Sequence, residues 1–141
     1  MEEEGVVYDD IGLDALHQES RKWISQLDFT SDEIDFFDHL LHSYVFEPDT
    51  PALFETLQGQ QKDMAVSRKK CKVLRQALQE HENKLGGLLE ISSETLDAAY
   101  KKQHLGLKHQ MEGCMAHYQN LKADIFSYGQ KVLKKRHRKD R

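Results

Sequence analysis

The sequence predicts an all-α protein, an elongated antiparallel three-helix bundle, and three observations lead to this prediction. Only two of the 141 residues are proline, which leaves long stretches free to be helical. Hydrophobic residues make up 38% and charged residues 31% of the chain, a balance typical of solvated helices around a narrow core. Apolar side chains recur at steps of three and four residues, the spacing of a coiled-coil seam. The expected helices span about 9–46, 50–90 and 93–136.

The first apolar row runs through the first third of the chain without a change of phase. Thr30-Ser31-Asp32-Glu33 has the form of a capping box, which would start a new helix. The row passes through this motif in phase, so we expect one helix and keep a four-helix arrangement, with a break near residue 30, as the alternative. The members of the row are Leu13, Leu16, Ser20, Trp23, Leu27, Thr30, Ile34, Phe37, Leu41 and Tyr44.

Two prolines separate the first helix from the second. Glu47-Pro48-Asp49 cannot continue a helix because proline lacks the N–H donor, and Thr50-Pro51 is a favourable cap and first turn. A further turn and cap are expected over Ile91-Ser92-Ser93-Glu94. The second row is Leu53, Leu57, Gln60, Met64, Ser67, Cys71, Leu74, Leu78, His81, Leu85 and Leu88. The third row is Tyr100, His104, Leu107, Met111, Cys114, Tyr118, Leu121, Ile125, Tyr128 and Val132.

Short connections between the helices fix an approximate register, because neighbouring helices then lie side by side. This register places Cys71 and Cys114 in one layer, where we expect small buried thiols rather than a disulfide or a reactive cysteine. The predicted layers are Leu27 with Cys71 and Cys114; Thr30 with Ser67 and Tyr118; Leu16 with His81 and His104; and Phe37 with Gln60 and Ile125.

Charge is distributed unevenly along what we expect to be a single domain, residues 1–136, followed by a basic tail, residues 137–141. Residues 1–49 hold 14 acidic side chains against two basic ones, whereas residues 91–141 hold 11 basic against five acidic. We expect the two regions to attract each other within the chain. No signal peptide or membrane-spanning run is visible, so the expected location is the cytoplasm.

Eight histidines raise the hypothesis of a metal site, because helix bundles commonly hold metals in their cores. His81 and His104 lie in the rows, and His39 and His42 stand beside aspartates. The Glu-x-x-His pairs of di-iron bundles are absent, and a histidine in a seam is more often a hydrogen-bonded core residue. We therefore expect no cofactor and keep a metal-binding bundle as the alternative.

The C-terminal segment raises the hypothesis of anion binding. No aromatic residue interleaves its bases, and the acidic first helix would repel nucleic acid, so we prefer a solvated helix end whose cations favour the macrodipole. No Gly-rich phosphate loop or Ser-centred elbow is present, so we expect no enzyme. The basic residues concerned are Lys134, Lys135, Arg136, Arg138 and Lys139.

Several large apolar residues fall outside the three rows. They would be buried by another copy of the chain or by a partner helix. We therefore expect a non-enzymatic helical scaffold or protein-interaction protein, with a homodimer as one form. Trp23 is expected to anchor the core first and to take part in an interaction second. The residues outside the rows are Phe36, Leu40, Val45, Phe54, Val66, Val73 and Phe126.

Two segments of the sequence are similar to a known group of proteins. They are Arg21-Lys22-Trp23-Ile24-Ser25-Gln26-Leu27-Asp28-Phe29 and Leu78-Gln79-Glu80-His81-Glu82-Asn83-Lys84-Leu85. Together they resemble short, uncharacterised, all-helical proteins of Bacteroidetes-type bacteria, in which a Trp-containing helix precedes a long helix with a His-Glu pair. The resemblance covers roughly residues 15–90 and implies a helical bundle in a bacterial cytoplasm. It implies no activity and no functional residues.

Overall fold

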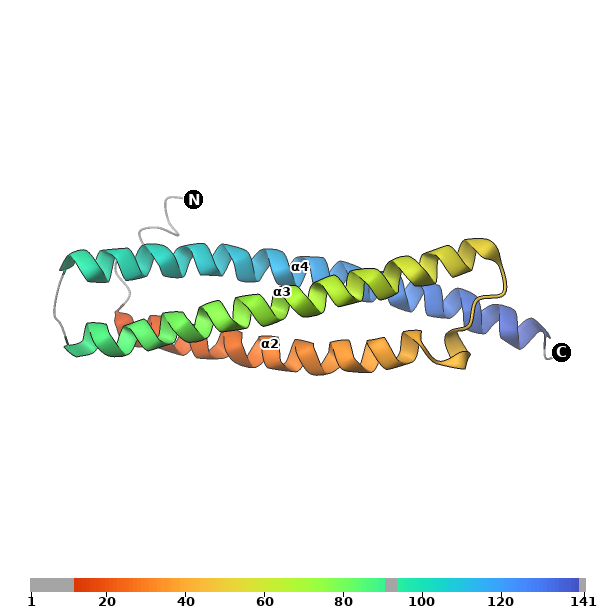
Figure 1. Ribbon diagram of the computed structural model, residues 1–141, viewed down its shortest axis with the longest axis horizontal. Coiled ribbons are helices and arrows are strands. Elements are labelled where there is room, and N and C mark those ends of the chain that lie inside the picture. Colours follow the sequence, from red (N-terminus) through yellow and green to blue (C-terminus); the bar gives the residue numbers. More distant parts are fainter. Residues whose placement is uncertain (1–11, 91–93, 140–141) are drawn as a thin grey trace. The chain divides into compact units, whose positions relative to one another are not determined.

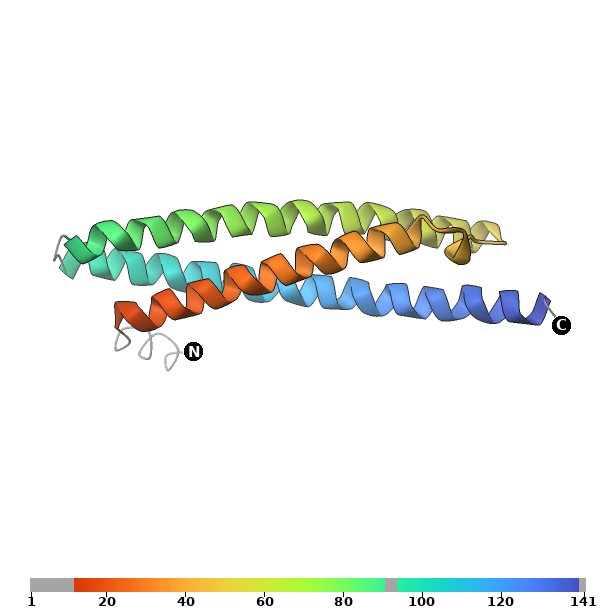
Figure 2. The same ribbon diagram turned by 90° about the horizontal axis from the view of Figure 1, so that it is seen from below.

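The computed structural model describes residues 12–90 and 94–139, and shows an all-α three-helix bundle (Figure 1). Its helices are α2 (Leu13–Leu41), α3 (Pro51–Glu90) and α4 (Glu94–Lys139). A one-turn 3₁₀ helix, η1 (Tyr44–Phe46), lies between α2 and α3. Along the chain the helices alternate in direction, so that α3 runs opposite to α2 and α4 (Figures 1 and 2). The expected start near residue 9 and the turn over 91–93 lie outside the described residues.

The contacts divide the chain into two compact units, and each unit contains part of all three helices. Unit 1 comprises Met1–Asp28 and Lys72–Gly113, and unit 2 comprises Phe29–Cys71 and Cys114–Arg141. Because α2 is continuous from Leu13 to Leu41, the alternative with a helix break near residue 30 is wrong. The potential cap at that point, Thr30, is instead buried and donates a hydrogen bond to Met115 Sδ at 3.8 Å.

The helix α2 ends five residues earlier than the sequence predicts. Its last turn tightens, because the amides of His42 and Ser43 donate to carbonyls three residues back, and Ser43 Oγ caps the Leu40 carbonyl at 2.7 Å. The chain then forms η1 before Pro48. Tyr44, the expected last member of the first row, is consequently 74% exposed.

Phe46 anchors the segment between α2 and α3. Its ring is buried and lies 5.8 Å from the Tyr128 ring, and Tyr128 donates its hydroxyl proton to the Phe46 carbonyl at 2.8 Å. Gly129 makes room for it, since a Cβ there would lie 2.8 Å from Phe46 Cζ. The expected cap of α3 is confirmed, because the Leu53 amide donates to Thr50 Oγ1 at 3.1 Å.

The three predicted rows form the core. Every described member is buried except Leu13, Leu53 and Cys114, which are half-buried, and Tyr44. The pairing of Cys71 with Cys114 and of His81 with His104 is confirmed by contacts of 3.9 Å and 3.0 Å.

One predicted layer is wrong by about one turn. Leu16 packs with Leu85 and Tyr100, whereas the residues of α2 that contact His104 are Ser20 and Trp23.

Candidate functional site: a buried histidine network and an exposed apolar face

A chain of polar contacts crosses the core of unit 1 and includes all three helices. His81 Nε2 on α3 lies 3.0 Å from His104 Nδ1 on α4. At one end, His104 Nε2 lies 2.8 Å from Glu19 Oε1 on α2. At the other end, His81 Nδ1 lies 3.3 Å from Gln103 Oε1. Both histidines are 0% exposed, although Glu19 and Gln103 reach the surface.

Two aromatic rings enclose the histidine pair. The Tyr100 ring stacks on His81 with a centroid distance of 4.0 Å and an interplanar angle of 6°. The Trp23 ring stacks on His104 at 4.8 Å and 24°. Each imidazole thus has one face covered by an aromatic ring, and neither imidazole is accessible to water, because both histidines are 0% exposed. Ser20 Oγ, also fully buried, lies 3.5 Å from His104 Nδ1.

The number of ring protons limits how this chain of contacts can be satisfied. A carboxylate at Glu19 and a carboxamide oxygen at Gln103 both accept, so the three contacts together require three protons. Two neutral imidazoles carry only two. With neutral rings, His104 donates to Glu19, His81 donates to His104, and the Gln103 amide must turn its N–H toward His81. If a third proton binds to His81 Nδ1, this nitrogen becomes a donor, and the Gln103 amide presents its oxygen to it as the acceptor.

Burial decides which of these states holds at neutral pH. Desolvation lowers the pKa of His81 to about 4, against the opposing effect of the hydrogen bond to Gln103. Desolvation also lowers the pKa of His104, although the hydrogen bond to Glu19 acts in the other direction. Lys84 and Lys108 lower the two pKa values further. Both imidazoles are therefore neutral near pH 7.

Next to the histidine pair, a second acidic side chain is almost fully enclosed. Glu82 Oε1 lies 2.7 Å from His17 Nδ1, and the Glu82 side chain is 9% exposed. Burial, with the Glu82 charge, raises the pKa of Tyr100 to about 12, so this phenol stays neutral. The histidine contacts fix the register of three helices within unit 1, while the Tyr100 hydroxyl and Glu82 Oε2 are buried without a hydrogen-bond partner among the described residues.

The arrangement does not favour the metal hypothesis. Among residues 12–90 and 94–139, no group of three or more His, Cys, Asp or Glu side chains is placed to hold a metal ion. His39 and His42 do not join the buried pair. Their Nδ1 atoms each lie 2.8 Å from a backbone carbonyl one turn back on α2.

In unit 2, the two thiols lie side by side between α3 and α4. Cys71 Sγ and Cys114 Sγ are 3.9 Å apart, with Cys71 buried and Cys114 half-buried. A hydrogen bond from the Cys71 thiol lowers the pKa of Cys114 to about 7, assisted by the charge of Lys70. The same contact and burial raise the pKa of Cys71. The contact therefore shifts the pKa values of the two thiols in opposite directions, with the lower one on the half-buried Cys114.

The predicted interaction residues do not all share one surface. Trp23 is 8% exposed and belongs to the core of unit 1, its expected first role. Val66 and Val73 are exposed on α3. Arg68 on α3 forms an ion pair with Asp35 on α2. Val66 is two residues before Arg68, about 200° around the helix, so Val66 lies on the side of α3 away from α2. Phe54, 49% exposed, lies in the first turn of α3.

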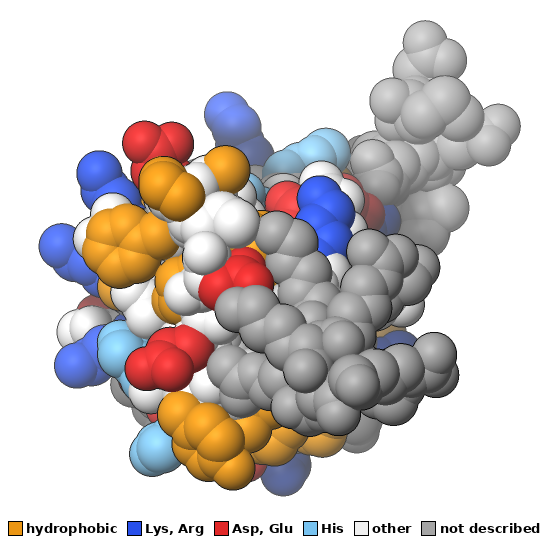
Figure 3. All heavy atoms as spheres, turned by 90° about the vertical axis from the view of Figure 1, so that its right-hand side faces the viewer, with side chains coloured by type: hydrophobic (Ala, Val, Ile, Leu, Met, Phe, Trp, Pro, Cys, Tyr) orange, Lys and Arg blue, Asp and Glu red, His pale blue; other side chains and the backbone are white. Residues whose placement is uncertain are grey.

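Phe36 and Phe126, in contrast, come together in unit 2. The Phe37 ring, in the core, lies 5.5 Å from Phe36 and 5.7 Å from Phe126, with edge-to-face geometry in both contacts. Phe36 and Phe126 are 62% and 56% exposed. Phe29, two turns before Phe36 on the same side of α2, is 65% exposed. Figure 3 looks onto the end at which α3 begins and shows hydrophobic side chains at the surface among charged ones.

The α4 side of this surface contains a second regular row, which we call the outer row. Its six members recur at steps of three and four residues, all are exposed, and none is charged. We call the outer row together with Phe29 and Phe36 the apolar face. Phe29 and the rest of the outer row were missed by the sequence analysis, although the spacing was present in the sequence. The outer row is Ala116, Gln119, Ala123, Phe126, Gln130 and Leu133.

The basic end of the chain adds little to the site. The helix α4 continues to Lys139, three residues beyond its expected end at 136. The side chains of Lys134, Lys135, Arg136, Arg138 and Lys139 lie outside the described residues, and anion binding by them stays a prediction. None of the helices in the described part of the chain is long and apolar enough to span a membrane.

The fold, the buried histidine network and the apolar face are the basis for a function, because comparisons with known proteins add none. No protein-family model matches the chain, and no curated protein or solved structure matches it significantly.

Proposed function

We propose that this protein is a non-enzymatic helical scaffold that binds another protein chain through the apolar face of unit 2. The observation that carries the proposal is the outer row of α4, beside Phe29 and Phe36 of α2. Three phenylalanines more than half exposed on one face are unusual in a chain in which 31% of residues are charged. Covering them with a partner removes their apolar area from water.

The spacing of the outer row indicates the kind of partner. Side chains at alternating steps of three and four residues form a straight stripe on a helix, which matches the stripe of a second helix. Phe126 and Leu133 are the large members, and Ala116 and Ala123, which precede them in the row, allow close approach. We therefore propose that the partner presents a helix to this face.

The histidine network supports a structural role for unit 1. Each imidazole nitrogen of His81 and His104 is within 3.3 Å of a polar atom of the same chain, and both rings are stacked. Such a network fixes the register of the three helices within unit 1. The proposal keeps the bacterial, cytoplasmic setting that the resemblance implies.

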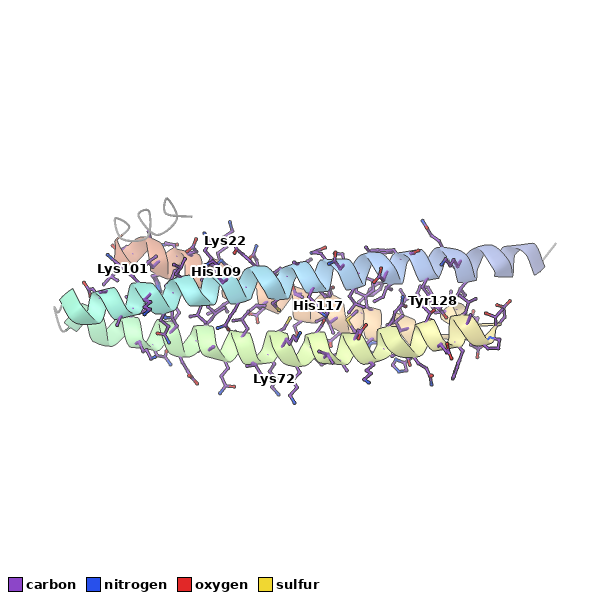
Figure 4. The ribbon with its side chains drawn as sticks, turned by 90° about the horizontal axis from the view of Figure 1, so that it is seen from above. Lys22, Lys72, Lys101, His109, His117 and Tyr128 are labelled. Carbon is purple, nitrogen blue, oxygen red and sulfur yellow. The ribbon has the colours of Figure 1, made fainter. Side chains whose placement is uncertain are left out.

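A photo-cross-linking amino acid in place of Gln119, incorporated in the native cell, tests the proposal. Gln119 is exposed within the outer row, so its replacement leaves the core intact. We expect a discrete cross-linked band that weakens when Phe126→Ala is added. The matched control places the same amino acid at Lys72, which is exposed and points outward from α3, away from α4 (Figure 4). Equal labelling at both positions, or none at Gln119, would contradict the proposal.

A further inference from the structure

The outer row of α4 is complementary to itself when its order is reversed, a property that a generic binding surface lacks. Its midpoint falls between Asp124 and Ile125. Rotation of a second α4 about that midpoint, in the antiparallel direction, places each large residue opposite an alanine and each glutamine opposite a glutamine. The facing pairs are Ala116 with Leu133, Gln119 with Gln130, and Ala123 with Phe126.

From this pattern we infer that the occupant of the apolar face is a second copy of this chain, bound through an antiparallel pair of α4 helices with twofold symmetry. The inference rests on the proposed function and names its partner. A twofold interface uses the same patch on both subunits, so every contact must pair a residue with its image in the reversed sequence. The outer row meets this requirement in all six of its layers.

The packing of such a pair is physically favourable. The large side chains of one copy fill the space above the alanines of the other, which lets the helix axes approach to about 8 Å. The row covers 17 residue steps, about 26 Å of helix, over nearly five turns. Side-chain amides at positions 119 and 130 can donate and accept reciprocally, so each polar layer can form hydrogen bonds across the pair.

The neighbouring helix α2 extends the same interface. In an antiparallel pair of α4 helices, the side of one α4 that carries α2 meets the same side of the other α4. Both α2 helices therefore lie on the same side of the dimer. Phe36 is level with Phe126 through their shared contact with Phe37, and Phe126 is next to the midpoint. The two Phe36 rings, each 62% exposed, therefore lie at the height of the symmetry axis on the same side of the pair, where they extend the apolar area.

Charge-reversal variants test the register and the direction together. Q119K/Q130K places like charges in every polar layer of the antiparallel pair, and Q119E/Q130E does the same with the opposite sign. Both side chains are exposed, so the fold is unaffected. We expect the unmodified chain to sediment as a dimer at tens of micromolar and each double variant to dissociate at least a hundredfold more readily.

Recombination of charges provides the sharpest outcome. An equimolar mixture of Q119K/Q130K and Q119E/Q130E should form the mixed dimer, and Q119K/Q130E should again form a dimer with itself. In a parallel pair position 119 would face position 119, so Q119K/Q130E would place like charges together and would not dimerise. The control Q58K/Q76K adds two charges at exposed positions of α3, away from the row, and should stay dimeric.

The results also separate this inference from the proposed function. A strict monomer at these concentrations, or dimers unaffected by Q119K/Q130K, would overturn the self-pairing. If the chain is a monomer while the cross-linker at Gln119 captures a different protein in the cell, the proposed function stands and only the identity of the partner is wrong. If neither self-association nor any cross-link occurs, both fail.

Discussion

His104 receives polar contacts from two other helices, from Glu19 and Ser20 of α2 and from His81 of α3. Each contact alone is a single hydrogen bond, but the three share one buried ring, so loss of one changes the proton position in the others. At the residue scale, unit 1 is held by this network and unit 2 by the contacts of Phe37, Phe46 and the thiol pair.

The lowered histidine pKa values predict that acid destabilises the fold. An unfolded histidine binds its proton near pH 6.5, whereas folded His81 resists it until about pH 4. The stability that neutral His81 contributes is therefore complete above pH 6.5 and is lost as the pH falls toward 4, by up to ~3 kcal/mol. Urea unfolding at stepped pH measures this loss. His81→Gln should remove much of the slope, and H39Q/H42Q should leave it; equal slopes in all three would contradict the network.

Gln103→Glu tests the proton inventory. A carboxylate at this position can only accept a hydrogen bond, so it favours the form of His81 that carries a proton on Nδ1. The native amide can instead donate its N–H to an unprotonated Nδ1. We expect the pKa of His81 to rise from about 4, which NMR titration of the imidazole Cε1 proton follows directly. Lys84→Gln, which removes a nearby cation without adding an acceptor for the ring, should raise it less. An unchanged pKa in the Gln103→Glu variant would show that this contact does not control the ring.

The thiol pair makes a separate prediction about reactivity. The Cys71 thiol stabilises the Cys114 thiolate, so alkylation of Cys114 should be half-maximal near pH 7. Cys71→Ala removes the donor and moves the pKa of Cys114 toward its ordinary value, which slows alkylation at pH 7 by roughly tenfold or more. Iodoacetamide labelling read by mass spectrometry measures both rates. A faster reaction in the Cys71→Ala variant would mean that access, not ionisation, limits the thiol.

At the scale of elements, the acidic α2 is paired with bases on both of its neighbours. Asp28 accepts two hydrogen bonds from Arg75 of α3 within unit 1. Within unit 2, Glu33 accepts from Lys122 and Tyr118 of α4. The expected attraction between the acidic and basic regions is therefore present in individual ion pairs. The more exposed of these contribute little, ~1 kcal/mol or less each, and mainly fix which faces meet.

The close approach of Phe46 to α4 predicts opposite effects of the same substitution at two glycines. Gly129→Ala places a methyl group 2.8 Å from Phe46 Cζ and should destabilise the fold by ~1–3 kcal/mol. Gly113→Ala, on the same helix, meets nothing within 4 Å and should stabilise it by ~0.5–1 kcal/mol, because alanine is the better helix former. Urea denaturation compares the two. Stabilisation by Gly129→Ala would mean that Phe46 is not seated against α4.

On the scale of the whole molecule, the part that the sequence predicts best is the core. A strict period of three and four residues determines which side chains can face two neighbours at once, and the described rows follow it. The end of α2 was missed because Pro48 affects the chain several residues before it, so that Tyr44 leaves the row. Leu16 was assigned to the wrong layer because a short loop fixes the register of helices only to about one turn.

The surface was less predictable than the core for a different reason. Exposure of Phe36 or Val66 follows from its absence from a row, but whether two such residues meet depends on the flank of each helix that turns toward its neighbour. That orientation separates Val66 from Phe36 and joins Phe36 to Phe126. The alanines of the outer row carry little hydrophobicity of their own, so their regular spacing was the only signal in the sequence.

The most direct test of the apolar face as a contact surface is its accessibility to carbene labelling, compared between the native cell and the purified chain diluted to nanomolar concentration. We predict that Phe126 and Leu133 are labelled in the dilute chain and protected in the cell, while Phe54, exposed on α3, is labelled equally in both. Equal labelling of all three residues under the two conditions would contradict the account.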